Sequence, residues 1–511
     1  MDKNYTCLFA HHHLHGEVSE HVFYYLKSLS ALSFRIIFIS DTSVEESLLQ
    51  RLTLEIPNCT FAQRKVSHSG EELWEWAISK GLVPSDTDWL ILTNSRLLGP
   101  LTDIGNILRD MDKPGIDFWA LTDSIHGGWH LQADFMCFSK SVFTSAVFRK
   151  GLAKGLGDMS KEDPSAGEVF LTKTLSDAGF RGAAWISCKT LASEDALVSV
   201  PDPTLKYPDK LILESGFPFI PKRLLLENPE NFSALQELFA YAGQHSSYPV
   251  EILKTTLTDV MQPGLAPIPA SPSITVLCHM FYPSSIYYFM RRLAPLKTYN
   301  VRFIFNLSVA LARDSFFLDI LQRAFPNSIL LTTPNKGRDI GGKLAAIDAL
   351  LKLDLPSDYS LVIHDKLSPH AHTGIAWRET LFKVIDEFRL PEIFRLFEKN
   401  KDTGVISALE FVKNEYNPDN DSFDCTSRDN LLSYIKTYAF HLSNYNFSAG
   451  TIFWIRTGIL KTFFRQFPPL TVREGLESGN ALDFTHGTNI HAWERLFSLL
   501  ANAQGFKVKG I

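Results

Sequence analysis

The chain has 511 residues, of which 45% are hydrophobic and 21% are charged, and its formal net charge is −6. One hydrophobic core rarely serves a chain of this length, so we expect two or three domains. The acidic balance argues against broad nucleic-acid binding, and no apolar stretch of the sequence is long enough to span a bilayer.

Cysteine usage and the first residues indicate the compartment. The 6 cysteines form no Cys-x-x-Cys pair, and most lie in apolar runs such as "FMCF" and "VLCHMF". Buried free thiols are typical of a reducing compartment. The first residues lack the long apolar core of a signal peptide. We therefore expect a cytoplasmic protein, which could still associate peripherally with the inner face of the cell membrane.

The chain begins with a strand, a turn rich in histidine and a helix. Residues 5–10 form an apolar run typical of a buried strand, and 19–32 have the spacing of an amphipathic helix. Four histidines, the first of them His11, lie between the two elements. Neighbouring side chains on an extended segment point in opposite directions, so this run does not favour a metal site. The carboxyl end of a parallel strand is, however, where α/β folds bind ligands.

The sequence then repeats itself. The strand, helix and strand over 5–41 recur over 274–308. Four further pairs follow in the same order: "HSGEELWEWAISKGL" (68–82) with "NKGRDIGGKLAAIDAL" (335–350), "DWLILTNSR" (88–96) with "DYSLVIHDK" (358–366), "DFMCFSKSVF" (134–143) with "GTIFWIRTGI" (450–459), and the segments that run from Glu168 and Glu494 to a Gly-Phe pair. A period this long fits duplicated domains and not a solenoid.

The copies are separated by a stretch of different character. A helical pattern is followed by "MQPGLAPIPASPS" (261–273), whose proline and small residues are typical of a semi-rigid linker. We therefore predict a first domain over 1–195, a connecting segment over 196–273 and a second domain over 274–511.

A glycine-rich loop, "TTPNKGRDIGGKL" (332–344), lies between an apolar strand and a helix in the second copy. Glycines in this position often cradle a phosphate. The spacing matches neither Gly-x-Gly-x-x-Gly nor the Walker motif, because Lys343 is followed by leucine. A sharp turn capped by Asp339 explains the loop equally well, so both interpretations stay open.

Each copy has two further polar features in the same order. "TNSR" and "IHDK" follow the fourth apolar strand, and Glu168 and Glu494 come late, at the start of a helix. A polar motif after a central strand and a late carboxylate are the order expected of a nucleotide-sugar glycosyltransferase of the GT-A class. Transfer of a sugar from a nucleotide needs a cation or metal for the departing diphosphate and a general base for the acceptor hydroxyl. We therefore predict an α/β fold of two tandem GT-A-like (Rossmann-like) domains joined by the helical, proline-rich segment.

Several motifs together resemble one family of bacterial proteins: "LFAHHHLHGEVSEHVFYYLKSL", "DFWALTDS", "HLQADFMCFSKSVF", "PNKGRDIGG", "LVIHDKLSPH", "SAGTIFW" and "HGTNIHAWERLF". From residue 5 to the C-terminus the chain resembles the rhamnan synthesis F family, whose members assemble rhamnose-containing cell-surface polysaccharides. The resemblance implies a rhamnosyltransferase that uses dTDP-rhamnose or GDP-rhamnose, with Mg²⁺ or Mn²⁺, and a growing or lipid-linked glycan acceptor. It implies other polysaccharide-assembly enzymes as partners.

The chain departs from the family pattern at four motifs. The family usually has Asn-Asp-Ser where this chain has Asn94-Ser95-Arg96, and an Asn-x-Gly-x-Asp loop where it has "HSGEE". The family usually has His-Thr-Lys-x-Ser at the motif that begins with His364, and Asp-Gly-Thr where this chain has His486-Gly487-Thr488. The first copy therefore lacks the expected metal-binding carboxylate, and an unusual donor or acceptor would be consistent with these changes.

The resemblance and the repeat together give the candidate site residues. We expect Glu494 and Glu168 to be catalytic bases and Asp365 to hold the metal ion. The donor is expected to contact His11, Asn94, His279, Asn335, Gly337, Arg338, Asp339, His364, Asp365 and Lys366. The acceptor is expected to contact His130, Gln132, Trp377, Arg378, Trp454 and His491.

These assignments have structural alternatives. The helix dipole stabilises a carboxylate in a first turn, which applies to Glu168 and Glu494. Polar residues at strand ends could be satisfied by their neighbours, and Trp377 and Arg378 could pack within a helix. One half could catalyse while the other binds glycan or a partner, or the whole chain could be a non-catalytic scaffold. The second half keeps more charge at its expected site, so we expect catalysis there.

Overall fold

The computed structural model describes most of the chain. Lys366 lies outside the described residues, as do His15, His486 and the loop residues 67–70. The described ranges are 3–13, 16–64, 71–155, 165–227, 232–262, 267–268, 271–365, 374–479 and 487–511. Their contacts divide the chain into two compact units, unit 1 (Met1–Val260) and unit 2 (Met261–Ile511).

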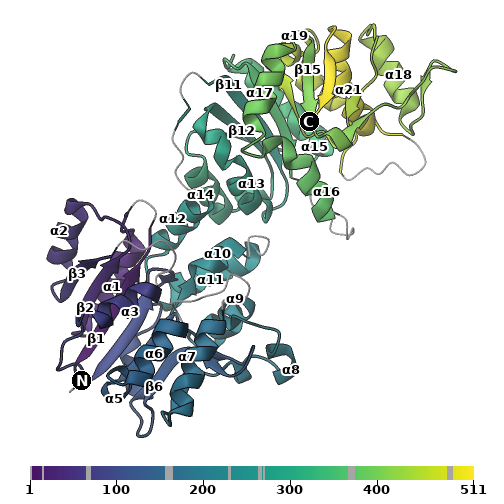
Figure 1. The fold of residues 1–511 in the computed structure, drawn as a ribbon. Coiled ribbons are helices and arrows are strands. Elements are labelled where there is room, and N and C mark those ends of the chain that lie inside the picture. The colour runs from purple at the N-terminus through teal and green to yellow at the C-terminus, as the bar shows by residue number, and fades with distance from the viewer. Residues whose placement is uncertain are drawn as a thin grey trace. The chain divides into compact units, whose positions relative to one another are not determined.

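Unit 1 is built on one mixed sheet (Figure 1). Its strands are β1 Tyr5–His11, β2 Arg35–Ser40, β3 Cys59–Gln63, β4 Trp89–Asn94, β6 Phe118–Ser124, β7 His130–Leu131, β8 Phe135–Ser139 and β9 Gly182–Ile186. They follow the order β3-β2-β1-β4-β8-β6-β7, and β9 also pairs with β6. The first four strands in this order are parallel, β8 is antiparallel to β4 and β6, and β9 is parallel to β6.

Unit 2 has a sheet of the same design. Its strands are β11 Ser273–Met280, β12 Asn300–Ser308, β13 Ile329–Thr333, β14 Tyr359–His364, β15 Thr403–Ser407, β20 Phe453–Arg456 and β21 Lys507–Gly510. They follow the order β13-β12-β11-β14-β20-β15-β21, and β20 is again antiparallel to both neighbours. The order and directions match those of β3-β2-β1-β4-β8-β6-β9, as the internal repeat predicts.

Helices cover both sheets. In unit 1 they are α1 Glu20–Ala31, α2 Glu46–Glu55, α3 Glu71–Ser79, α4 Ile104–Met111, α5 Lys140–Phe143, α6 Ala146–Gly155, α7 Ala166–Asp177, α8 Glu194–Leu197, α9 Pro203–Lys206, α10 Lys222–Glu227, α11 Phe232–His245 and α12 Val250–Met261. In unit 2 they are α13 Ser285–Leu293, α14 Ser315–Ala324, α15 Arg338–Lys352, α16 Gly374–Leu381, α17 Leu390–Lys399, α18 Arg428–Thr437, α19 Thr457–Gln466, α20 Pro469–Glu474 and α21 Asn489–Ala503. In the described part of the chain, none of these is both long and apolar enough to cross a membrane.

Short strands pair outside the two large sheets. They are β5 Leu97–Leu98 with β10 Ile220–Pro221, β16 Val412–Lys413 with β19 Phe447–Ser448, and β17 Tyr416–Asn417 with β18 Ser422–Phe423. Residues 196–260, predicted from the sequence as part of a connecting segment, belong by their contacts to unit 1, and the β5–β10 pair is one of these contacts.

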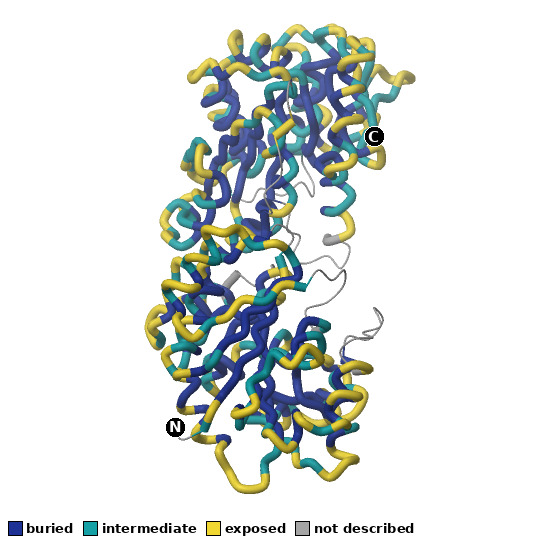
Figure 2. The backbone as a smooth tube through the Cα atoms, turned by 60° about the vertical axis from the view of Figure 1, so that its left-hand side comes forward, coloured by how far each residue is buried: buried dark blue, intermediate teal, exposed yellow. Residues whose placement is uncertain are grey.

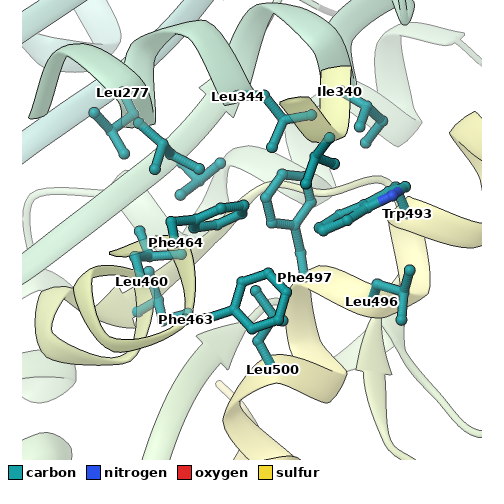
Figure 3. Packing of buried hydrophobic residues seen from close by; sticks show 14 of the residues in the cluster. Leu277, Ile340, Leu344, Leu460, Phe463, Phe464, Trp493, Leu496, Phe497 and Leu500 are labelled. Atoms are coloured by element: carbon teal, nitrogen blue, oxygen red, sulfur yellow. The ribbon is translucent and has the colours of Figure 1, made fainter. Parts of the chain in front are cut away.

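The central strands are buried along their length, as parallel strands covered on both faces should be (Figure 2). In unit 2 the core joins α15 to α19 and α21 (Figure 3). Ile340 and Leu344, one helical turn apart on α15, belong to the same cluster as Phe464 and Trp493, whose rings stack 6.1 Å apart. Truncating Leu344 to alanine should cost about 2–5 kcal/mol. This packing fixes the position of α15 and α21, which carry the candidate site residues.

Candidate functional site

Two histidines lie at the carboxyl ends of the central strands of unit 2: His279 is next to last on β11, and His364 is last on β14. They are register partners, so they lie side by side at the carboxyl edge of the parallel strands. His279 Nδ1 lies 3.1 Å from the backbone oxygen and 2.9 Å from the side-chain nitrogen of Asn306. Burial lowers the pKa of His279 to about 4, so the ring is neutral at pH 7.

Helix α15 lies against the His279 ring because residue 342 is glycine. A Cβ atom on Gly342 would lie 2.3 Å from the ring. Gly337 is the N-cap of the helix, and its backbone N–H donates to the oxygen of Glu477 at 2.7 Å. The glycines of this loop therefore permit a sharp turn and close backbone packing, but the predicted cap by Asp339 is wrong, because no side chain among the described residues caps this helix.

The backbone is strained at two places that meet here. Gly337 and Arg338 have φ values of 76° and 49°, and Gly450 and Thr451 have values of 77° and 52°. The left-handed region is uncommon for any residue but glycine, and a β-branched residue such as threonine is an outlier there. The hydroxyl of Thr451 donates to Asp339 Oδ2 at 3.2 Å, which joins the two segments. Strained residues of this kind cluster at functional sites.

A wholly buried lysine connects these parts. Lys343 Nζ lies 3.1 Å from Asp339 Oδ2, 2.9 Å from His364 Nδ1 and 3.0 Å from the backbone oxygen of Thr451, and it also contacts the Thr451 hydroxyl. The lysine side chain is 0% exposed and that of Asp339 is 25% exposed. The ammonium is therefore compensated by a carboxylate that still reaches solvent.

Asp365 holds a backbone turn. Its Oδ2 atom accepts the N–H groups of Phe281 and Tyr282, both at 2.6 Å, and the hydroxyl of Ser285 at 3.0 Å. Ser95 in unit 1 does the same for the turn after β1, since its Oγ accepts the N–H of His12 at 3.4 Å. Burial raises the pKa of Asp365 to about 6, although these hydrogen bonds oppose the shift.

One oxygen of each carboxylate in this donor set is already occupied by protein donors. Asp365 Oδ2 is occupied by three donors, and Asp339 Oδ2 is occupied by an ammonium and a hydroxyl. Across the described ranges, no three or more His, Cys, Asp or Glu side chains are grouped so that they could hold a metal ion. A metal at Asp365 thus stays a prediction from the sequence.

Glu168 and Glu494 occupy matching places in the two units. Glu494 Oε1 on α21 accepts the N–H of Gly450 at 2.6 Å, shortly before β20. Glu168 Oε1 on α7 accepts the N–H of Ala133 at 2.6 Å, shortly before the matching strand β8. Because Thr451 follows Gly450, a single turn joins Glu494 to the Lys343 cluster.

Glu168 lies beside the two residues predicted to contact the acceptor in unit 1. Gln132 Nε2 is 3.1 Å from Glu168 Oε2, and His130 Nε2 is 3.6 Å from the same oxygen. The Glu168 side chain is 16% exposed, and burial raises its pKa well above the usual range. A carboxyl group with a raised pKa in a partly exposed position is suited to acid–base chemistry.

His11 and Asn94, each predicted to contact the donor, point to opposite faces of the sheet. Asn94 is the register partner of Ala10, so the next residue, His11, points to the opposite face of the sheet. The His11 ring lies against Phe38, its Nε2 is 3.0 Å from the oxygen of Glu17, and burial lowers its pKa to about 4. The two residues therefore cannot read the same part of a ligand from one face.

The remaining predicted residues are dispersed in unit 2. Trp454 is fully buried and donates its indole N–H to Val384, so it is a core residue that no acceptor reaches in this structure. Arg378 is also buried, with its guanidinium 4.2 Å from the centre of the Tyr288 ring. Trp377 is 36% exposed. His491 Nδ1 is 2.6 Å from the hydroxyl of Thr488 at the start of α21, and the backbone oxygen of Asn335 accepts the N–H of Gly479.

Sequence reasoning missed Lys343 and Thr451. A lysine in an amphipathic helix usually faces solvent, so Lys343 gave no signal beyond its position four residues after Asp339. A threonine in the sequence gives no indication that its backbone is left-handed, so the conformation of Thr451 could not be predicted. The neighbouring Gly450 was the only available hint, since glycine is favoured where φ is positive.

Comparison with known proteins identifies the family. The match to rhamnan synthesis protein F spans residues 36–506. The chain belongs to this family. It is a glycosyltransferase-like family, named for the synthesis of rhamnan. No curated protein sequence matches the chain.

Solved structures give weaker likenesses. The glycosyltransferase GlyE of Streptococcus pneumoniae is 12% identical with a TM-score of 0.27, over 74% of this chain and 89% of that one. The mannosyltransferase PcManGT of Pyrobaculum calidifontis, in complex with GDP-Man and Mn²⁺, is 12% identical with a TM-score of 0.25, over 50% and 79%. Mouse xyloside xylosyltransferase 1 is 10% identical with a TM-score of 0.23, over 36% and 84%.

Proposed function

We propose that this member of the rhamnan synthesis protein F family is a glycosyltransferase that moves a sugar, rhamnose, from a nucleotide-sugar to a growing or lipid-linked cell-surface polysaccharide. We propose two tandem GT-A-like domains, because the large sheets of units 1 and 2 share one strand order. We also propose that the protein is cytoplasmic and associates with the inner face of the cell membrane.

One observation carries the assignment of the site. At the carboxyl edge of unit 2, two strained backbone segments, a buried lysine and a helix carboxylate converge through Gly450 and Thr451. Ligands of open α/β sheets bind at this edge. We place the donor diphosphate by the loop before α15, where the side chain of Arg338 supplies positive charge. We place the acceptor by Glu494.

The chemistry assigned to Glu494 is general base catalysis. With Oε1 held by Gly450 N–H, the proton of the acceptor hydroxyl goes to Oε2, which also lies 3.5 Å from Arg495 Nη1. The acceptor oxygen then bonds to the anomeric carbon, and the bond from that carbon to the diphosphate breaks with its electron pair on the diphosphate. The positive charge at the loop before α15, that of Arg338, stabilises the negative charge that develops on the departing diphosphate.

The second candidate is a pair in which only unit 2 catalyses and unit 1 binds glycan. It is favoured by the asymmetry at the end of the fourth strand, where unit 1 has Asn94 and Ser95 and unit 2 has His364 and Asp365.

The test is sugar transfer from a panel of nucleotide-sugars, including dTDP-rhamnose and GDP-rhamnose, to rhamnose oligosaccharides. Glu494→Gln keeps the shape but removes the proton acceptor, so the rate should fall roughly 10²- to 10⁴-fold with donor affinity unchanged. Glu168→Gln is the matched variant and should have a much smaller effect. A large loss only with Glu168→Gln would move catalysis to unit 1, and no transfer or donor hydrolysis with any donor would favour a scaffold.

A further inference from the structure

A pocket lies among the helices that cover the sheet of unit 1. It has a volume of about 240 Å³ and is bounded by α1, by residues 100–104 at the start of α4, and by Ser247 in the turn between α11 and α12. The hydroxyl of Tyr24 on α1 lies 3.2 Å from Ser247 Oγ, which joins two of these walls. The Tyr24 ring packs edge-on against the Tyr248 ring at 4.7 Å, and this packing holds the wall in place.

The pocket is remote from the edge where the donor and the acceptor are expected. Helix α1 connects the parallel strands β1 and β2, so it starts near the carboxyl ends of the strands and returns to the amino end, where β2 begins. The pocket residues Ser28 and Leu32 belong to the end of that path. At 1.5 Å per residue, Leu32 lies about 18 Å along the helix from Glu20. The pocket is therefore distinct from the candidate donor and acceptor residues at the carboxyl edge.

The polar groups of the lining offer mainly acceptors. The hydroxyls of Ser28 and Thr102 donate to backbone oxygens at 2.9 and 3.2 Å, and each hydroxyl oxygen can still accept a hydrogen bond from a ligand. Asp103 is exposed and caps α4, since its Oδ1 atom accepts a backbone N–H of that helix at 2.8 Å. A carboxylate can accept further hydrogen bonds. Among the described residues that line the pocket, there is no Lys, Arg or His.

This lining selects a ligand that donates hydrogen bonds and carries no negative charge. A phosphate would be repelled by Asp103 with no cation to compensate it, and a metal ion would need more charged oxygens than one carboxylate provides. A sugar has several hydroxyl donors and also C–H faces, for which Leu32, Pro100 and Leu101 supply apolar surface. A cavity of about 150 Å³ holds a benzene ring, so this pocket suits one six-membered sugar ring with its substituents.

We propose that this pocket is a carbohydrate site separate from the catalytic site, and that it holds one sugar of the polysaccharide while the end of the chain reacts elsewhere. Its apolar wall suits the methyl group of a 6-deoxy sugar, of which rhamnose is one. The identity of the sugar rests on the proposed function, whereas the site itself holds whichever unit catalyses.

Hydrogen exchange on the full chain locates the binding. A rhamnose oligosaccharide, titrated to about 10 mM, should slow exchange roughly threefold or more in peptides from the second half of α1 and from residues 100–105. Ser28→Leu fills the pocket with a residue that suits a helix, so it should abolish this protection. Ala31→Leu adds similar bulk at an exposed position one turn later and should keep the protection.

Asp103→Asn is the second variant. Asparagine caps a helix as well as aspartate does, so α4 stays intact, but loss of the charged acceptor should weaken binding roughly tenfold in the same titration. Asp314→Asn is the matched control, because Asp314 is the N-cap of α14 in unit 2 and accepts the N–H of Phe317 at 3.0 Å. It should bind the oligosaccharide as wild type does. Wild-type melting temperatures show that the variants fold.

A glucose oligosaccharide is the second probe. Protection of the pocket peptides by this probe in place of the rhamnose oligosaccharide keeps the site and rejects rhamnose as its sugar. The proposal is overturned if neither probe protects these peptides, or if Ser28→Leu is protected as wild type is. Transfer activity is not measured, so failure of the proposed function leaves this test intact.

Discussion

Replacing Lys343 by methionine should loosen the start of α15 while leaving the rest of unit 2 folded. The methionine fills most of the volume but removes the ammonium that contacts Asp339, His364 and the backbone oxygen of Thr451. Breaking a buried ion pair costs about 3–5 kcal/mol, and a buried acceptor without a partner about 1–3 kcal/mol. Because Asp339 is 25% exposed, water compensates part of its charge, and we expect about 3 kcal/mol.

Hydrogen exchange measured on peptides from α15 reports the free energy of local opening. A loss of about 3 kcal/mol makes exchange roughly 100-fold faster. Lys352→Met is the matched control on the same helix, since its contact with Asp348 is 2.8 Å long but the lysine is 67% exposed, so it should cost at most about 0.5 kcal/mol. Asp339→Asn added to Lys343→Met should recover part of the loss by removing the uncompensated charge. Exchange of Lys343→Met within about threefold of wild type would refute the reasoning.

Three further predictions follow from the same geometry. Gly342→Ala should lower the free energy of unfolding by about 1–3 kcal/mol, because the new methyl group would lie 2.3 Å from the His279 ring. Gly458→Ala is the control and should be neutral or stabilising, because its methyl group would meet nothing within 4 Å. Equal effects of the two variants in denaturant unfolding would contradict this prediction. His21 has its pKa lowered by burial from 6.5 to about 3, so the unfolded chain binds the extra proton and stability should fall as pH drops below 6.5, by about 2 kcal/mol at pH 5. His21→Gln should reduce the loss of stability between pH 7 and pH 5 by that amount. An unchanged dependence of stability on pH would exclude this histidine as its cause. Asp365→Ser copies Ser95 and should keep donor affinity within about threefold if the carboxylate only holds the turn; a loss of tenfold or more would restore its predicted role in donor binding.

The sequence was informative where a pattern has one physical cause. Apolar runs along the chain indicate the strands, and the repeat of these runs predicted that the two sheets share one topology. The same alignment paired Glu168 with Glu494, and each accepts a backbone N–H shortly before a matching strand; only Glu168 lies in the first turn of its helix as predicted, because α21 already begins at Asn489.

Side-chain environment was harder to predict. Trp454 looked like an acceptor platform, but an indole in a central strand is equally at home in the core, and only the packing decides between them. Lys343 is invisible in the sequence because its burial depends on Asp339, His364 and Thr451, which come from three separate segments. The sequence suggests that Asp365 is a metal ligand, because the backbone N–H groups that donate hydrogen bonds to it cannot be predicted from the sequence.

The bond from Gly450 N–H to Glu494 Oε1 has a consequence for the product. A carboxylate with both oxygens at liberty can take a proton from many directions, but here the N–H of Gly450 occupies part of Oε1 and Arg495 Nη1 lies 3.5 Å from Oε2, so fewer directions stay open. In the proposed function, the acceptor sugar then has to turn one chosen hydroxyl toward Oε2 before it reacts. Regiochemistry of the growing polymer would in this way be set by the angle of a backbone clamp, and an enzyme with a different turn at this place would make a different linkage with the same base.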